Sequence, residues 1–236
     1  MFSPLIRGNV MTFTGESESI VSDEVAAGAA IYSNFVLSVY DIEVLMFELP
    51  VIFKCPLKSM RNYYASHLSD NHLELGVGTG YFPSKALPKL VNPTIHLMDL
   101  NPNSLEKTSL RLRKYSPISH LHNVFDPIPS NLPLFKSIAA FNFFHCLPGT
   151  MLEKEVVITN LKRHLQKGGV FYGATVLGEG LKVGKLFEKT NAFYNKKGIF
   201  TNLKDNRKDL EYILMNNFSH FSVEIIGGLA FFYGHD

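Results

Sequence analysis

The sequence has few cysteines and little net charge, and each shortage excludes a class of protein. The two cysteines, Cys55 and Cys146, lie far apart without metal-ligand spacing, so we expect neither a disulfide framework nor a metal site. The net charge of +2 provides neither a nucleic-acid-binding field nor a basic patch for a membrane surface. The densest polar stretch, residues 204–208, mixes both signs and is expected to be a solvated loop. The sequence therefore predicts neither nucleic acid nor a membrane as a partner.

Long apolar runs are also missing. The most apolar stretch, residues 35–53, is interrupted by Asp41, Glu43, Glu48 and Pro50, whereas a membrane-spanning helix needs about 20 mostly apolar residues. The start of the sequence shows no charged and then apolar secretory signal. Together with the low cysteine content, these absences predict a cytoplasmic protein.

What is present suits a single α/β domain. A chain of 236 residues with 46% hydrophobic content can bury one sizeable core. Residues 1–24 mix small and polar residues without a usable period, which predicts a poorly ordered leader. Apolar residues at helical spacing over residues 25–55 predict lid helices, and residues 56–236 are expected to form the core of one domain spanning 25–236.

The chain is organised around residues 74–80, which read Glu-Leu-Gly-Val-Gly-Thr-Gly after a short apolar run. This pattern predicts a buried parallel strand that ends in a sharp turn, because glycine permits a positive φ and lets a ligand approach the backbone. The dinucleotide pattern Gly-x-Gly-x-x-Gly is not met, because Tyr81 occupies its third glycine position. An NAD-type enzyme is therefore only an alternative.

Strand and helix signals alternate along the rest of the chain. The predicted strands are residues 71–75, 94–99, 118–124, 137–143 and 170–176. The predicted helices are residues 57–68, 81–90, a segment from Pro102, a segment from Thr150-x-x-Glu153 to Gly168-Gly169, 181–196 and 207–217. Residues 221–226 and 229–233 flank Gly227-Gly228, which predicts a β-hairpin.

The glycine motif resembles the first motif of the class I S-adenosylmethionine-dependent methyltransferases, in which an acid lies two residues before the first glycine. The order of elements over residues 56–234 is similar as well. The resemblance implies a doubly wound, seven-stranded Rossmann-like α/β sheet with a C-terminal antiparallel hairpin and N-terminal lid helices. It also implies S-adenosylmethionine as the cofactor and S-adenosylhomocysteine as the product.

Residues near the first two strand ends are the first candidates for holding that cofactor, because ligands of such sheets bind at the carboxyl ends of the strands. The resemblance implies that Gly76, Gly78 and Gly80 offer bare backbone to the amino-acid part and the ribose. Glu74 would act on the ammonium group through hydrogen bonds or water. Asp99, which ends the second strand, would accept both ribose hydroxyl protons.

Later strand ends supply the remaining candidates. Leu100 would lie against the adenine. Where the family has an acid that accepts from the adenine amine, this sequence has Asn123, a departure that leaves Asp126 as a rival. Val124 would donate its backbone N–H to the adenine ring, and Asn142 would lie near the methyl-donor end.

Two further candidates lie near the reacting atoms. His145 could act as a general base, because the unperturbed pKa of histidine is near neutral. A histidine surrounded by Phe, Cys and Leu is, however, more often a packing residue. Tyr40 in the lid could bind the sulfonium through its ring or hydroxyl, or it could be an amphipathic helix residue.

The predicted function is transfer of a methyl group from S-adenosylmethionine to a small molecule, by O- or N-methylation of an apolar or aromatic metabolite. The apolar lid, rich in Phe, Tyr, Leu and Val, suits such an acceptor. The alternative is a protein that binds S-adenosylmethionine on the same fold for regulation or for a reaction other than methylation, because fold alone does not decide function.

Overall fold

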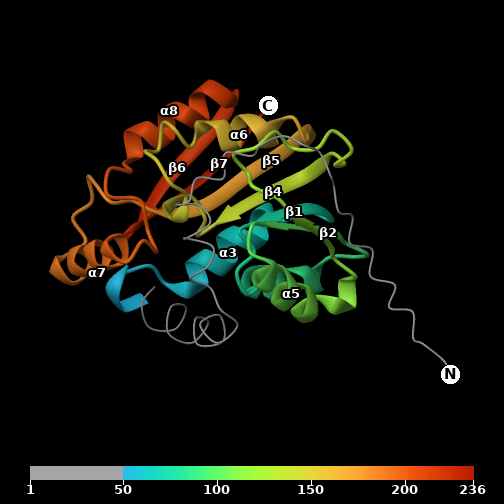
Figure 1. Cartoon of the computed structure of the whole chain (residues 1–236), viewed down its shortest axis with the longest axis horizontal. Coiled ribbons are helices and arrows are strands. Elements are labelled where there is room, and N and C mark those ends of the chain that lie inside the picture. Colours follow the sequence, from blue (N-terminus) through green and yellow to red (C-terminus); the bar gives the residue numbers. More distant parts are fainter. Residues whose placement is uncertain (1–49) are drawn as a thin grey trace.

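The computed structural model describes residues 50–236 (Figure 1). The predicted leader, Tyr40 and the lid up to residue 49 lie outside the described residues. The described part forms a seven-stranded sheet with the order β3-β2-β1-β4-β5-β7-β6. The strands are β1 (Asn71–Leu75), β2 (Thr94–Asp99), β3 (Ile118–Leu121), β4 (Phe135–Phe141), β5 (Leu165–Val176), β6 (His220–Ile226) and β7 (Leu229–His235).

Strand direction confirms the predicted topology. The neighbouring strands from β3 to β5 are all parallel, whereas β7 runs antiparallel to both β5 and β6. The order changes direction at β1, where β2 lies on one side and β4 on the other. Such a switch point is where doubly wound sheets bind their ligands, and the glycine turn follows β1 directly.

Helices cover both faces of this sheet (Figure 1). α3 (Leu57–His67), α4 (Tyr81–Ala86) and α7 (Lys185–Lys196) pack on one face, and α6 (Glu155–Lys162) and α8 (Arg207–Asn217) pack on the other. α5 (Pro102–Arg111) packs against β2 and β3. Short 3-10 turns complete the chain: η2 (Leu87–Lys89), η3 (Arg113–Tyr115) and η4 (Phe144–Cys146). Among the described residues, none of these helices combines the length and the apolar character needed to cross a bilayer.

Side chains alternate between the two faces along each strand, because successive strand residues point to opposite sides. On β5, Tyr172 and Ala174 join the apolar cluster that contains Tyr64 of α3. Phe171, the residue before Tyr172, points the other way and joins the cluster of α6 and α8. The central strands are thus buried on both faces, which explains their continuous apolar sequences.

The predicted element boundaries hold best where capping or turn signals are local. β1, β2 and α8 have the predicted bounds. The Asn101 side chain accepts a hydrogen bond from the Asn103 N–H at 2.9 Å, as expected of the residue that caps α5. β3 instead ends at Leu121, three residues early, and β4 begins and ends two residues early.

The prediction that Gly168-Gly169 ends a helix is wrong. α6 already ends at Lys162, and both glycines lie within β5. The strand pairing shifts register here, and a Cβ at Gly169 would lie 2.9 Å from the carbonyl oxygen of Phe135. The glycine therefore allows a close approach between β5 and β4. The predicted start of α7 at residue 181 is also wrong, because Gly184 has φ +139° and the helix begins only after it.

Two polar residues of β1 point into the interior beneath α3. Tyr64 donates a hydrogen bond to Glu74 Oε2 at 2.5 Å, and His72 Nε2 lies 2.9 Å from the same oxygen. His72 Nδ1 lies 2.8 Å from Ser137 Oγ on β4. These hydrogen bonds meet the requirement that buried polar groups have partners, and they join α3, β1 and β4.

We expect Tyr64→Phe to lower the free energy of unfolding by about 1–3 kcal/mol, because it removes a donor to a buried carboxylate. Urea unfolding followed by far-ultraviolet circular dichroism measures the change. The matched control is Tyr212→Phe, since Tyr212 is 50% exposed on α8. A loss in Tyr64→Phe no greater than in this control would contradict the assigned role of the network.

Candidate functional site

The glycine turn leads from β1 into α4 and brings three glycines into left-handed backbone conformations. Gly76, Gly78 and Gly80 have φ values of +57°, +51° and +68°. The Gly76 N–H donates to the carbonyl of Met98 on β2 at 3.0 Å, so the turn stays attached to the sheet. The predicted sharp turn is thus present after β1.

The surroundings of the three glycines differ. A Cβ at Gly76 would lie 2.2 Å from the Phe143 ring, and a Cβ at Gly80 would lie 2.7 Å from the Thr108 methyl group. A Cβ at Gly78 would meet no atom within 4 Å. The turn is therefore packed at both ends and open in the middle, which leaves space for a ligand beside the Gly78 Cα.

Asp99 at the end of β2 lies against this turn. Its carboxylate accepts a hydrogen bond from the Asn101 N–H at 2.8 Å, and the backbone N–H groups of Val77 and Gly78 also act on it. Burial raises the pKa of Asp99 to about 6, and these backbone hydrogen bonds oppose the rise. The half-buried Leu100 follows at once. The structure thus brings Asp99 and the glycine turn together, as the sequence predicted.

Asn123 lies beside Asp99 but in a loop, because β3 ends before it. The His122 N–H donates to the Asp99 carbonyl at 3.1 Å, and Val124 is buried. Asn123 Oδ1 accepts from the Phe125 N–H at 3.2 Å, whereas Asn123 Nδ2 is buried without a partner among the described residues. The side chain therefore presents a donor where the sequence suggested an acceptor.

Asn142 follows β4 and has the left-handed φ of +53°, which is uncommon for a residue with a side chain. Its backbone N–H donates to the carbonyl of Ala174 on β5 at 2.7 Å. Its Oδ1 is buried and has no hydrogen-bond partner among the described residues. A buried acceptor in this state is unfavourable unless a ligand or water completes it.

Glu74 is held from the opposite side. The residue is 4% exposed, and its Oε2 receives the hydrogen bonds of Tyr64 and His72 described above. Glu74 lies two residues before Gly76, which is the acidic position in the first motif of the methyltransferase family that the sequence resembles. Its action on the ammonium group stays a prediction.

His145 lies inside the protein, 2% exposed, with its ring 4.4 Å from the Phe200 ring. Its Nδ1 accepts the Val176 N–H at 3.2 Å and lies 3.3 Å from Thr175 Oγ1. Burial, with the nearby Lys154 charge, lowers the pKa of His145 to about 3. These contacts favour the packing interpretation over a general base.

Sequence reasoning missed a buried ion pair near this end of the sheet. Lys154 Nζ lies 2.6 Å from Asp205 Oδ2, and both side chains are almost fully buried. The expectation that Asp205 belongs to a solvated loop is wrong, because the charge of Lys154 balances it in the interior. No local sequence pattern predicts an ion pair whose two residues lie 51 positions apart. Within residues 50–236, no group of three or more His, Cys, Asp or Glu residues could hold a metal ion.

Comparisons with known proteins agree with this geometry. A family model described as a methyltransferase domain matches residues 73–171. Demethylluteothin O-methyltransferase from Streptomyces thioluteus is 35% identical over 215 residues, which cover 90% of this chain and 94% of that protein. The physcion biosynthesis cluster O-methyltransferase from Aspergillus chevalieri is 33% identical, with 87% and 93% covered. Among solved structures, the DhpI–S-adenosylhomocysteine complex has a TM-score of 0.62 at 14% identity, covering 89% of this chain and 95% of that one.

Gly76→Ala should destabilise the fold more than Gly78→Ala. Both changes place an L residue at positive φ, at about 1–2 kcal/mol, but only the Gly76 Cβ would overlap the Phe143 ring. Urea unfolding of both variants measures the difference in unfolding free energy. A double-mutant cycle with Phe143→Ala provides the control, because removing the ring should shrink the excess cost at Gly76. Equal losses at the two glycines would contradict the packed end of the turn.

Proposed function

The chain belongs to the class I S-adenosylmethionine-dependent methyltransferases, and we propose that it methylates a hydroxyl group of an apolar or aromatic small molecule. The observation that carries the choice of oxygen is the similarity, over nearly their whole length, to relatives named O-methyltransferases. Family membership decides against the NAD-type alternative. The cytoplasmic location and the single-domain boundaries stay predictions.

The described residues fit the cofactor. Four groups follow strand ends at one edge of the sheet: the open space beside the Gly78 Cα, the adjacent Asp99 carboxylate, and the Asn123 Nδ2 and Asn142 Oδ1 atoms, which have no partner among the described residues. In the proposal, Asp99 accepts from the ribose hydroxyls, Asn123 Nδ2 donates to the adenine, and Asn142 Oδ1 accepts from the amino-acid part. The glycine backbone would lie against the ribose.

The acceptor side is proposed to lie beyond β4 and β5, where aromatic side chains gather. The Tyr194 ring of α7 lies 4.9 Å from the Phe200 ring, and Phe187 of α7 packs edge-on against Phe53 at 5.6 Å. The Gly228 N–H of the β6–β7 turn donates to the Phe53 carbonyl at 2.7 Å, which fixes that segment to the carboxyl-end edge of β5. Asn191 of α7 adds a buried Oδ1 without a partner among the described residues, an acceptor for a substrate hydroxyl.

S-adenosylmethionine supplies a methyl group that is already activated on the sulfonium. The task of the chain's residues is therefore to orient the acceptor oxygen and to exclude water, a positional contribution of roughly 7–11 kcal/mol in favourable cases. The acceptor hydroxyl loses its proton to solvent as its oxygen takes the methyl group and the bond from that methyl to sulfur breaks. His145 is not assigned to receive this proton, because its Nδ1 already accepts the Val176 N–H and burial lowers the pKa of its ring to about 3. His145 instead holds the end of β5 in place.

A matched set of acceptors tests the proposal. The enzyme is incubated with radiolabelled S-adenosylmethionine and pairs of aromatic compounds that differ only in carrying a hydroxyl or an amine. We expect label in the phenolic member and stoichiometric release of S-adenosylhomocysteine. Label only in the amines would overturn O-methylation. Binding of S-adenosylmethionine without any turnover would favour the regulatory alternative.

The affinity for S-adenosylhomocysteine should depend on pH through Asp99. The ionised carboxylate accepts the ribose hydroxyls, and the raised pKa of about 6 means that the carboxyl gains a proton as pH falls through this value. Affinity should be constant above about pH 7 and decline by up to about tenfold per pH unit below 6. Isothermal titration calorimetry between pH 5 and 8 measures this dependence.

Asp99→Asn provides the control for this profile. The variant should bind more weakly, by about 1–3 kcal/mol, because an amide satisfies the ribose hydroxyls less well. Its affinity should also lose the dependence on pH near 6. A wild-type profile that is flat from pH 5 to 8, or an unchanged profile in Asp99→Asn, would remove Asp99 from the site.

A further inference from the structure

The buried ion pair between Lys154 and Asp205 has no role in the reaction as described so far. The Lys154 side chain is 0% exposed and the Asp205 side chain 1%, and their charged atoms lie 2.6 Å apart. Asp205 Oδ1 is buried without a hydrogen-bond partner among the described residues. Burial raises the pKa of Asp205 and lowers that of Lys154, and the attraction between the two opposes both shifts.

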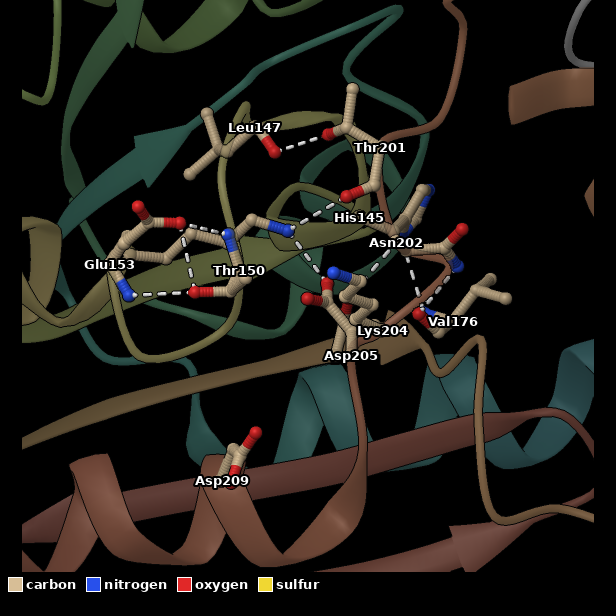
Figure 2. Close-up of polar contacts among 12 residues, drawn as sticks. His145, Leu147, Thr150, Glu153, Val176, Thr201, Asn202, Lys204, Asp205 and Asp209 are labelled. Carbon is tan, nitrogen blue, oxygen red and sulfur yellow. Dashed lines mark hydrogen bonds and ion pairs between the residues drawn. The ribbon is translucent and has the colours of Figure 1, made fainter. Parts of the chain in front are cut away.

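The pair joins two segments that are far apart in the sequence. Lys154 ends the segment that follows β4, and Asp205 lies in the loop between α7 and α8. Figure 2 shows further hydrogen bonds between the same segments. Thr201 donates twice, from its N–H to the His145 carbonyl at 2.8 Å and from its Oγ1 to the Leu147 carbonyl. The Thr201 carbonyl in turn accepts from Lys154 Nζ at 3.5 Å.

The loop after β5 is attached at the same place. The backbone N–H groups of Gly178 and Glu179 donate to the Asp205 carbonyl at 3.0 and 3.1 Å. Asn202 Nδ2 donates to the Val176 carbonyl at 2.9 Å (Figure 2). Asn202 also exchanges two hydrogen bonds with Asn195, which connects α7 to the group. The segments after β4, β5 and α7 therefore meet around one ion pair.

One of these segments begins at the cofactor turn. Asn142 and Phe143 follow β4, and the Phe143 ring fills the space beside Gly76. Lys154 then fixes the other end of the segment, residues 142–154. The segment is thus held at the turn by packing and at its far end by charge.

An ion pair is an expensive way to join these segments. Burying two charges carries a large desolvation cost, and well-packed apolar side chains of similar volume are often equally stable or more stable. A charge pair differs from an apolar contact in its direction and distance requirements. The Lys154–Asp205 pair therefore sets a direction and a distance between the two segments that an apolar contact would not set.

We propose that Lys154 and Asp205 are positioning residues that hold the acceptor-facing segments after β4, β5 and α7 at a fixed distance from the cofactor turn. This inference rests on the proposed function for its catalytic consequence. Neither residue is assigned a contact with the cofactor or the acceptor. Breaking the pair should loosen the segments and misplace the acceptor while leaving cofactor binding intact.

The first test measures the segments without reference to activity. Hydrogen–deuterium exchange is compared between wild type and Asp205→Asn. We expect faster exchange in residues 143–154 and 200–206 and unchanged exchange in the glycine turn. Asp70→Asn is the matched control, because Asp70 pairs with Lys136 at 2.9 Å, also a Lys–Asp pair, but with both side chains about half exposed. Unchanged exchange in Asp205→Asn would overturn the proposal even if no methyl acceptor were found.

The second test measures catalysis per binding-competent site, with site concentration taken from S-adenosylhomocysteine titration. Asp205→Asn should keep its dissociation constant for S-adenosylhomocysteine within about twofold and lose at least about tenfold in kcat/KM for the acceptor. Lys154→Arg should retain more activity than Lys154→Met, because it preserves the charge pair. A residue needed only for folding would lower the number of competent sites without changing kcat/KM per site.

Should Asp205→Asn fail to fold, the double variant Lys154→Met/Asp205→Leu replaces the pair by apolar side chains. We expect it to fold and still to show the loss in acceptor kcat/KM. Full kcat/KM in the folded double variant would overturn the positioning role. Absence of methyl transfer in the wild type would overturn the proposed function, and hydrogen exchange would then decide the inference alone.

Discussion

The conformation of the glycine turn constrains the rest of the site. Three residues at positive φ in close succession allow β1 to stop and α4 to start without carrying the chain away from the sheet. The space that side chains would fill at Gly76 and Gly80 is taken by Phe143 and Thr108. The turn therefore determines where the segment after β4 begins and where α5 packs. Asp99 reaches the turn because it directly follows Met98, which pairs with Leu75, the last residue of β1.

Unpaired buried polar atoms show where the fold departs from maximum stability. Among the described residues they are His122 Nε2, Asn123 Nδ2, Asn142 Oδ1, Tyr172 OH, Asn191 Oδ1 and Asp205 Oδ1. All but Tyr172 lie in loops at the carboxyl ends of the parallel strands or in α7 and the loop after it. On the central strand β1 the buried polar side chains have partners: Glu74 accepts a hydrogen bond from Tyr64, and His72 is hydrogen-bonded to Ser137. Native proteins accept such violations mainly at functional sites, where a ligand can satisfy them.

Sequence reasoning succeeded where a signal is local. Glycine spacing predicted the turn, and Asn101 with Pro102 predicted the start of α5, because both signals act within a few residues. It failed where distant strands decide the outcome. Gly168-Gly169 suggests the end of a helix, but the close approach of β4 makes it part of β5. Asp205 suggests a solvated loop, but its partner Lys154 lies 51 positions away. Asn123 follows β3, but its Oδ1 already accepts the Phe125 N–H, which leaves Nδ2 as its unpartnered atom among the described residues. Its contact with the adenine stays a prediction.

The same contrast separates the two halves of the proposed active site. The cofactor half depends on residues 74–100 together with Asn123 and Asn142, and each of these groups is positioned by its own strand end or the turn after it. The acceptor half depends on segments joined by long-range contacts, such as Thr201 with His145 and Asn202 with Val176. A substitution at Asp99 or Asn123 acts on local contacts, whereas in the proposal a substitution at Lys154 or Asp205 displaces several segments together. Changes in acceptor choice can therefore arise from residues that never touch the acceptor, because positional alignment dominates this chemistry.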